Sequence, residues 1–120
     1  MTKIMVVDDE NDLREMLGLM LKKEGYEIGM AINGADFLDR LDDFQPDLVT
    51  LDVMMPGLTT LEILDKLKEK KTKTKVILLT VVRYSEEEKQ QIFKMGNVID
   101  YITKPFELDD LVNIIKKHMQ

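Results

Sequence analysis

Five short apolar runs alternate along the chain with segments whose apolar residues recur at helical spacing. The runs are too short for helices and are rich in Val, Ile and Leu, which is typical of strands buried on both faces. Alternating strands and helices predict an α/β fold, with a doubly wound parallel sheet, helices on both faces and right-handed crossovers. The expected strands are Lys3–Val7, Tyr26–Ile32, Leu48–Asp52, Val76–Thr80 and Ile99–Thr103.

The segments between these strands carry local signals for the starts of helices. Thr59 with Glu62, and Ser85 with Glu88, have the spacing of a capping box, in which each side chain bonds the backbone N–H of the other residue. Asn33 is a suitable N-cap for the helix between the second and third strands. In the helix after Thr59, three leucines at helical spacing are expected to face the core: Leu61, Leu64 and Leu67.

Length and composition predict a single globular domain over residues 1–120. The net charge of -6 argues against direct nucleic-acid binding, which depends on neutralising phosphates with Lys and Arg. No apolar stretch approaches membrane-spanning length, so we expect no membrane insertion. The chain has no cysteine, which excludes disulfides and thiolate metal sites and agrees with a cytoplasmic location.

Polar residues stand at the carboxyl ends of four of the five expected strands. In a parallel sheet these ends lie along one edge, where open α/β sheets bind ligands. Asp8 and Asp9, Asp52, Thr80 and Lys104 would therefore meet in one pocket. Carboxylates this close repel one another, and a hard cation such as Mg²⁺ relieves the repulsion. An ammonium and a hydroxyl suit phosphoryl oxygens, so the set indicates a phosphoryl site rather than five unrelated residues at strand ends.

Five separated motifs in this order closely resemble response regulator receiver domains, and the resemblance covers the chain from end to end. It implies a CheY-like, flavodoxin-like (βα)5 fold with sheet order 2-1-3-4-5. The motifs are Asp8-Asp9, Asp52, Met55-Pro56-Gly57, Thr80 and Lys104-Pro105-Phe106.

The resemblance also implies a role for each acidic residue. Asp52 matches the phosphoacceptor, which takes a phosphoryl group from a histidine kinase or a histidine phosphotransfer protein to form an aspartyl phosphate. Asp9, Asp52 and the backbone carbonyl of Met54 match the ligands of Mg²⁺, for which Mn²⁺ is a possible substitute. Asp8 matches a metal-site carboxylate that acts through a bound water.

Other positions match residues that contact the phosphoryl group or respond to it. Lys104, the hydroxyl of Thr80 and the backbone of Val81 match the phosphoryl-contacting groups. Thr80 and Tyr101 match the pair that switches on phosphorylation, and Pro105 follows a cis peptide bond in the family. The family is a signalling switch rather than an enzyme, limited to its own phosphorylation and slow dephosphorylation.

The signal is expected to pass through one surface to a downstream protein target. That surface comprises the helix that begins at Ser85, the strand Ile99–Thr103 and the final helix with Leu108 to Met119. We expect the protein to be a monomer or a weak homodimer that associates through the same face.

Two departures from the family pattern leave an alternative open. Val81 is larger than the small residue usual there and would crowd the phosphoryl site, which favours a phosphorylation-independent interaction module as the alternative function. Met54 and Val82 stand where polar residues orient the hydrolytic water, so their apolar side chains predict a long-lived aspartyl phosphate.

Three other readings are weaker. An aspartyl-phosphate phosphatase needs an acid where Met54 stands, and a flavin carrier needs a small polar loop where Asp8-Asp9-Glu10 stands. His118, the single histidine, lies near the end of the last helix, where a structural role explains it.

Overall fold

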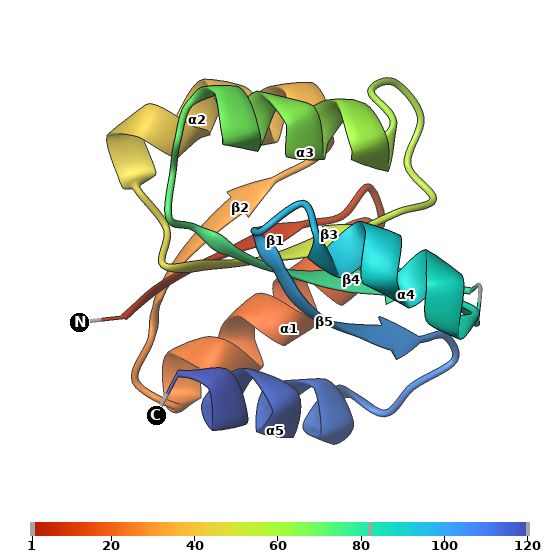
Figure 1. Ribbon diagram of the computed structural model, residues 1–120. Coiled ribbons are helices and arrows are strands. Elements are labelled where there is room, and N and C mark those ends of the chain that lie inside the picture. The colour runs from red at the N-terminus through yellow and green to blue at the C-terminus, as the bar shows by residue number, and fades with distance from the viewer. Residues whose placement is uncertain (1, 82, 120) are drawn as a thin grey trace.

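A parallel sheet of five strands, in the order β2-β1-β3-β4-β5, lies between two layers of helices in the computed structural model (Figure 1). The structure describes residues 2–81 and 83–119. The strand order and the alternation of strand and helix confirm the doubly wound α/β fold predicted above. The elements are β1 (Lys3–Val7), α1 (Asn11–Lys23), β2 (Glu27–Ala31), α2 (Gly34–Phe44), β3 (Leu48–Asp52), α3 (Thr60–Glu69), β4 (Lys75–Thr80), α4 (Glu86–Phe93), β5 (Val98–Thr103) and α5 (Leu108–His118).

The central strand β3 supplies both cores of the molecule, because successive side chains of a strand point to opposite faces. Val49 and Leu51 pack with residues of α2 and α3, and Leu48 packs with residues of α1 and α5. Figure 1 shows the same division, with α2 and α3 above the sheet and α1 and α5 below it. All five residues of β3 are buried, so Asp52 at its carboxyl end is held in a fully packed element.

Side-chain caps fix the starts of three helices as the sequence predicts. The Thr59–Glu62 pair forms a complete capping box, with both hydrogen bonds at 3.1 Å. Ser85 and Glu88 form a second one at α4, with bonds of 3.1 and 3.2 Å. Asn33 caps α2 by accepting a 2.8 Å bond from the N–H of Asp36. Each cap satisfies N–H groups that the first helical turn leaves unpaired.

Leu61 does not face the core, so this part of the prediction for α3 is wrong. The helix begins at Thr60, which puts Leu61 in the first turn with a side chain that is 60% exposed. The buried residues of α3 are Ile63, Leu64 and Leu67. Ile63 packs closely against the start of α2 because Gly34 has no side chain there; a Cβ at Gly34 would lie 2.4 Å from Ile63 Cδ1.

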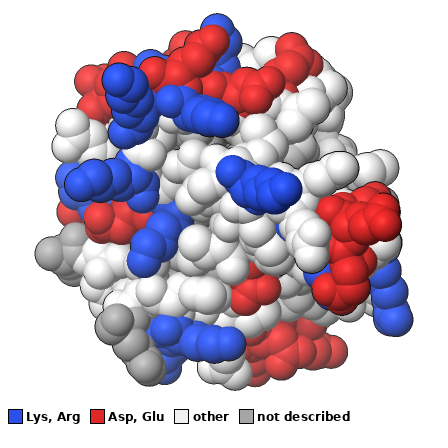
Figure 2. Space-filling model, in the orientation of Figure 1, with Lys and Arg blue, Asp and Glu red and all other residues white. Residues whose placement is uncertain are grey.

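The helix α4 is the least embedded of the five, with no fully buried residue. Its first turn carries Glu86, Glu87 and Glu88. Figure 2, in the orientation of Figure 1, shows a patch of acidic side chains at the right, the side on which α4 lies. Negative charge there suits the positive end of the helix dipole. No helix in the described part of the chain is long and apolar enough to cross a membrane.

Candidate functional site

Three carboxylates converge at the carboxyl edge of the sheet. Asp8 and Asp9 follow β1, and Asp52 ends the neighbouring strand β3. One carboxylate oxygen from each lies within 4.8 Å of the other two. Asp8 and Asp52 are buried while Asp9 is exposed, so the cluster is open on the side of Asp9.

Asp8 is the carboxyl group most perturbed by this arrangement. Its Oδ1 accepts a 2.8 Å hydrogen bond from the N–H of Glu10, whereas its buried Oδ2 has no hydrogen-bond partner among the described residues. Burial raises the pKa of Asp8 from 3.8 to about 6, and the charges of Asp52 and Asp9 add to the rise. The Glu10 hydrogen bond and the charge of Lys104 oppose it. A buried, unpartnered carboxylate oxygen beside two other carboxylates fits a bound cation.

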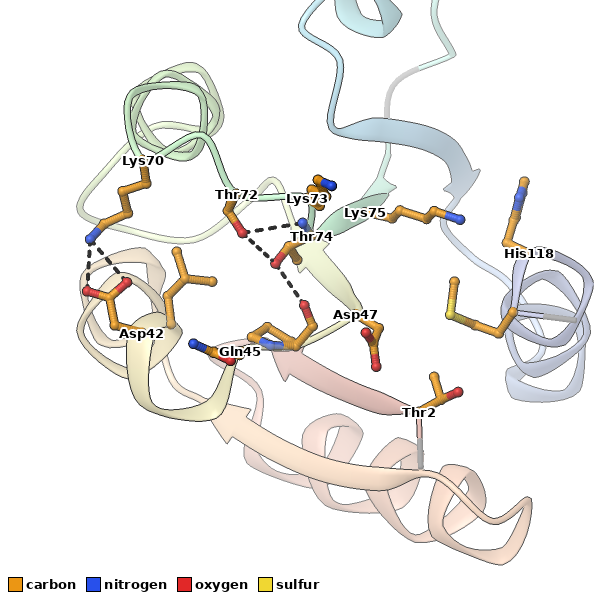
Figure 3. Close-up of a pocket in the computed structure, with 13 residues that line it drawn as sticks. Thr2, Asp42, Gln45, Asp47, Lys70, Thr72, Lys73, Thr74, Lys75 and His118 are labelled. Carbon is orange, nitrogen blue, oxygen red and sulfur yellow. Dashed lines mark hydrogen bonds and ion pairs between the residues drawn. The ribbon is translucent and has the colours of Figure 1, made fainter.

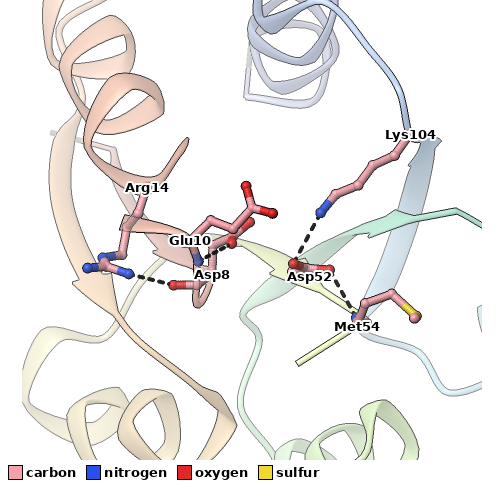
Figure 4. Close-up of polar contacts among 6 residues, drawn as sticks. All are labelled: Asp8, Glu10, Arg14, Asp52, Met54 and Lys104. Carbon is pink, nitrogen blue, oxygen red and sulfur yellow. Dashed lines mark hydrogen bonds and ion pairs between the residues drawn. The ribbon is translucent and has the colours of Figure 1, made fainter. Parts of the chain in front are cut away.

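Asp52 has a different set of partners, and each of its oxygens is engaged (Figure 4). Oδ1 accepts a 2.9 Å hydrogen bond from the N–H of Met54, and Oδ2 forms a 3.1 Å ion pair with Lys104 Nζ. The Asp52 side chain is 3% exposed and the Lys104 side chain 20%. This ion pair therefore joins a buried carboxylate to an ammonium that still reaches the surface.

Thr80 lies beside this pair at the end of β4. It is fully buried, it pairs in register with Thr103 of β5, and its carbonyl accepts a 2.6 Å bond from the N–H of Lys104. The Lys104–Pro105 peptide bond is cis. The structure thus gathers all five of the strand-end residues that the sequence placed at one edge.

Val81 and Met54 lie at the surface of the site. Their side chains are 53% and 62% exposed, so Val81 does not fill the space over Asp52 from within the core. Val81 lines an open cavity of about 440 Å³, together with Glu10, Leu13, Lys104, Pro105, Phe106 and Leu108. Val82, the other half of the predicted apolar pair, lies outside the described residues.

Tyr101 of β5 is tied to α4 and to the loop before it. Its ring packs edge-to-face on Tyr84, with ring centroids 5.2 Å apart, and Lys89 Nζ lies 5.7 Å from the centre of the Tyr101 ring. The hydrogen bond of Lys89 to Tyr101, followed by that to Glu86, raises the pKa of Lys89. The sequence analysis named Tyr101 only as the partner of Thr80 in the switch, and it gave no sign of Tyr84 and Lys89 as neighbours of its ring.

Arg14 was not singled out from the sequence, although it touches the acidic loop. Its Nη1 donates a 2.7 Å hydrogen bond to the carbonyl of Asp8 (Figure 4). His118, by contrast, is remote from this edge; its Nε2 lies 3.0 Å from Asp100 Oδ2, which agrees with the structural role expected for it.

Another cavity lies at the opposite edge of the sheet, near the amino ends of the strands (Figure 3). Its volume is about 860 Å³, and its lining includes Lys70, Lys73 and Lys75. Lys70 is engaged by Asp42 at 3.2 Å, and lysines at the end of α3 complement the negative end of the helix dipole. Helix stability and the Asp42 ion pair therefore account for Lys70, whereas Lys73 and Lys75 lie beyond the helix, in the turn and at the start of β4.

Comparison with known proteins agrees with this geometry. The model of the response regulator receiver domain family matches residues 4–116. Response regulator TrrA from Thermotoga maritima, solved in complex with Mg(2+)-BeF, is 39% identical over 98% of both chains, with a TM-score of 0.78. Chemotaxis protein CheY4 of Vibrio cholerae is 28% identical over 98% of both chains, with a TM-score of 0.85. The receiver domain of Francisella response regulator 1452 is 29% identical over 100% of both chains, with a TM-score of 0.83.

These matches extend over nearly the whole chain, and the strand order is the one that the resemblance implied. The chain therefore belongs to the response regulator receiver domain family, the CheY-like signalling modules of two-component systems.

Proposed function

We propose that this chain is a phosphorylation-dependent switch whose phosphoacceptor is Asp52. The observation that carries the proposal is the environment of its carboxylate. One oxygen is held by the Met54 N–H and the other by Lys104, beside the unpartnered Oδ2 of Asp8. A nucleophile that is fixed in direction and surrounded by groups for charge neutralisation is what phosphoryl transfer requires of a protein.

The donor set fits Mg²⁺ as the cofactor. Asp8, Asp9 and Asp52, with the backbone carbonyl of Met54, would hold the ion, and Mn²⁺ has the same preference for oxygen ligands. The buried Oδ2 of Asp8 supports this assignment, because such an oxygen is costly without a partner. When bound, the ion would neutralise charge on the oxygens of the incoming phosphoryl group.

In the proposed transfer, a carboxylate oxygen of Asp52 attacks the phosphorus of a phosphohistidine on a histidine kinase or a histidine phosphotransfer protein. The new O–P bond forms as the P–N bond breaks, and the electron pair of that bond returns to the imidazole. Lys104 then pairs with a phosphoryl oxygen, and the Thr80 hydroxyl and the Val81 N–H donate to the others. The open cavity beside Lys104 has Leu13 and Phe106 in its lining, and it would give the donor protein an apolar contact surface close to Asp52.

The charge of the phosphoryl group on Asp52 would change the positions of Thr80 and Tyr101. Movement of Thr80 toward the phosphoryl group frees space beside Tyr101, whose ring contacts reach Tyr84 and Lys89. The face formed by α4, β5 and α5 is then the surface for a downstream protein target and for a weak homodimer. The domain extends over residues 1–120 and acts in the cytoplasm as a switch rather than an enzyme, without membrane or direct nucleic-acid contact.

Intact-mass spectrometry after incubation with Mg²⁺ and acetyl phosphate tests the proposal. The parent should gain one phosphoryl group and Asp52→Asn none. Asp47→Asn is a matched control, because Asp47 directly precedes β3 at the opposite edge of the sheet; this variant should be phosphorylated like the parent. A slow loss of the adduct is the result expected from the apolar Met54.

An adduct that persists in Asp52→Asn would overturn the assignment of the phosphoacceptor. Absence of any adduct, both with acetyl phosphate and with a phosphorylated histidine kinase, would favour the phosphorylation-independent interaction module. The exposed position of the Val81 side chain argues against that alternative, because it leaves the site accessible.

A further inference from the structure

The guanidinium of Arg14 fastens the loop that carries two of the three carboxylates. Nη1 donates a 2.7 Å hydrogen bond to the carbonyl of Asp8, and Nη2 donates to Oδ1 of Asn11. Figure 4 shows that Arg14 reaches Asp8 from the side away from Asp52. Arg14 lies in the first turns of α1, so the contact joins the start of a helix to the residue that directly follows β1.

The other polar groups of Asp8 are also held, with one exception. Its N–H donates to the carbonyl of Ala31 at 3.2 Å, and its Oδ1 accepts from the N–H of Glu10. Among these partners Arg14 contributes a side chain, whereas Ala31 and Glu10 contribute backbone atoms. The exception is Oδ2, which has no partner within the described chain, in a carboxylate group that lies close to those of Asp9 and Asp52. The three bonds therefore fix the direction in which Oδ2 points.

Arg14 contacts Asp8 through the backbone carbonyl rather than through the carboxylate. The cation that lowers the pKa of Asp8 is Lys104, which opposes the effect of burial. The charge of Arg14 acts instead on Asp36, whose pKa is lowered chiefly by its hydrogen bond to Arg40 and to a smaller extent by Arg14. A substitution that keeps the charge of Arg14 but loses its two hydrogen bonds therefore separates the effect of the charge from that of the hydrogen-bond geometry.

We propose that Arg14 is a positioning residue that presets the Asp8–Asp9 loop for binding a divalent cation. The inference rests on the proposed function, since it assumes that the acidic cluster takes up Mg²⁺. Removal of a group that orients a metal ligand typically weakens metal affinity by about 10- to 100-fold. Arg14 acts through a backbone carbonyl, so we expect about a 10-fold loss, at the lower end of that range.

The test is a Mg²⁺ titration of the full chain followed by ¹H–¹⁵N NMR at pH 7.5. Arg14→Lys keeps the charge, but a compact ammonium cannot reproduce the forked contact with Asp8 and Asn11. Arg40→Lys is the matched control, because Arg40 is an exposed helical arginine whose ion pair with Asp36 lies outside the acidic cluster. We expect Mg²⁺ affinity to fall about 10-fold in Arg14→Lys and to stay unchanged in Arg40→Lys.

Equal affinity in Arg14→Lys and the parent would overturn the inference. Asn11→Ala, which removes the second acceptor of the guanidinium, provides an independent variant and should weaken Mg²⁺ binding in the same direction. A purely structural role predicts a lower melting temperature with unchanged Mg²⁺ affinity, so unfolding is measured in EDTA alongside. Failure of the parent to bind Mg²⁺ would instead overturn the proposed function, and the inference with it.

Discussion

The carboxylate of Asp52 and the ammonium of Lys104 lie 3.1 Å apart, although the residues are 52 positions apart in the sequence. The pair is formed across the sheet edge by the ends of β3 and β5, with β4 between them. Lys104 is also the cation whose charge opposes the effect of burial on the pKa of Asp8, the neighbouring carboxyl group. Its removal should therefore change the titration of Asp8.

Lys104→Met should raise the pKa of Asp8 above its value of about 6. Lys104 is one of the two groups that lower this pKa, so its loss leaves burial and the neighbouring carboxylates less opposed. The measurement is a ¹³C NMR titration of the aspartate carboxyl groups without divalent cations. Lys75→Met, at the opposite edge of the sheet, is the control and should leave the Asp8 titration in place. An unchanged Asp8 midpoint in Lys104→Met would contradict the electrostatic account.

Asp8→Asn should stabilise the metal-free protein at pH 7.5. Folding raises the pKa of Asp8 from 3.8 to about 6, so the folded state binds the Asp8 proton more tightly than the unfolded state. The resulting contribution to the free energy of unfolding is fully present below about pH 4. That contribution is lost as the pH rises through 6. A neutral amide avoids the loss, and we expect a gain on the order of 2 kcal/mol at pH 7.5 and little change at pH 4.

Urea unfolding in EDTA at the two pH values measures this gain. Asp65→Asn, which removes an exposed carboxylate from α3, should change stability little at either pH. A destabilised Asp8→Asn at pH 7.5 would show that the carboxylate is better accommodated than its burial implies.

Mg²⁺ binding should weaken in acid because the ion competes with a proton for Asp8. With a pKa of about 6, this carboxyl is largely ionised at pH 7 and largely protonated at pH 5. Metal ligands bind in their deprotonated form, so the affinity should fall about tenfold between these two pH values. Titration of Mg²⁺ at both values tests this. In Asp8→Asn the affinity should be lower throughout and should vary much less with pH.

The fold and the convergence of the strand-end residues follow from patterns that a sequence displays directly. The β-branched runs fix strands such as β3 and β4, and parallel strands place Asp8, Asp52 and Thr80 along one edge whatever the details of the loops. The caps at Thr59 and Ser85 were equally predictable, because a capping box has a fixed spacing.

Contacts that depend on loop geometry could not be predicted in this way. Arg14 binds a backbone carbonyl, and neither its spacing nor its chemistry identifies that partner before the turn after β1 is known. The contact of Tyr84 with Tyr101 likewise depends on the path of the loop before α4. Leu61 was misplaced because its spacing of three residues from Leu64 suits a helical face, whereas the buried face of α3 is formed by Ile63, Leu64 and Leu67.

Gly34→Ala should destabilise the protein by about 1 kcal/mol, because the added methyl group would overlap Ile63 in a packed core. The new Cβ would lie 2.4 Å from Ile63 Cδ1. Ile63→Val removes that atom. The double variant should therefore be destabilised by less than the sum of the two single destabilisations. Urea unfolding of the four proteins measures the coupling. Strictly additive effects would show that Ile63 moves aside without cost.

Two buried threonines should respond in opposite directions to replacement by valine. Thr50, in the middle of β3, is fully buried, and its hydroxyl has no hydrogen-bond partner among the described residues. An unpartnered buried hydroxyl costs about 1–3 kcal/mol, so Thr50→Val should stabilise the protein by about 1 kcal/mol. Thr74, just before β4, donates a 2.8 Å hydrogen bond to the carbonyl of Pro46.

Thr74→Val should therefore destabilise the protein by about 1 kcal/mol, since it leaves the carbonyl of Pro46 without this donor. The substitution is chemically the same at both positions, and both side chains are at most 4% exposed. The change in side-chain volume is thereby matched, and the opposite signs report whether the lost hydroxyl had hydrogen-bond partners. If Thr50→Val proves destabilising as well, the Thr50 hydroxyl has a hydrogen-bond partner such as a buried water, and the expected cost of an unpartnered hydroxyl is contradicted.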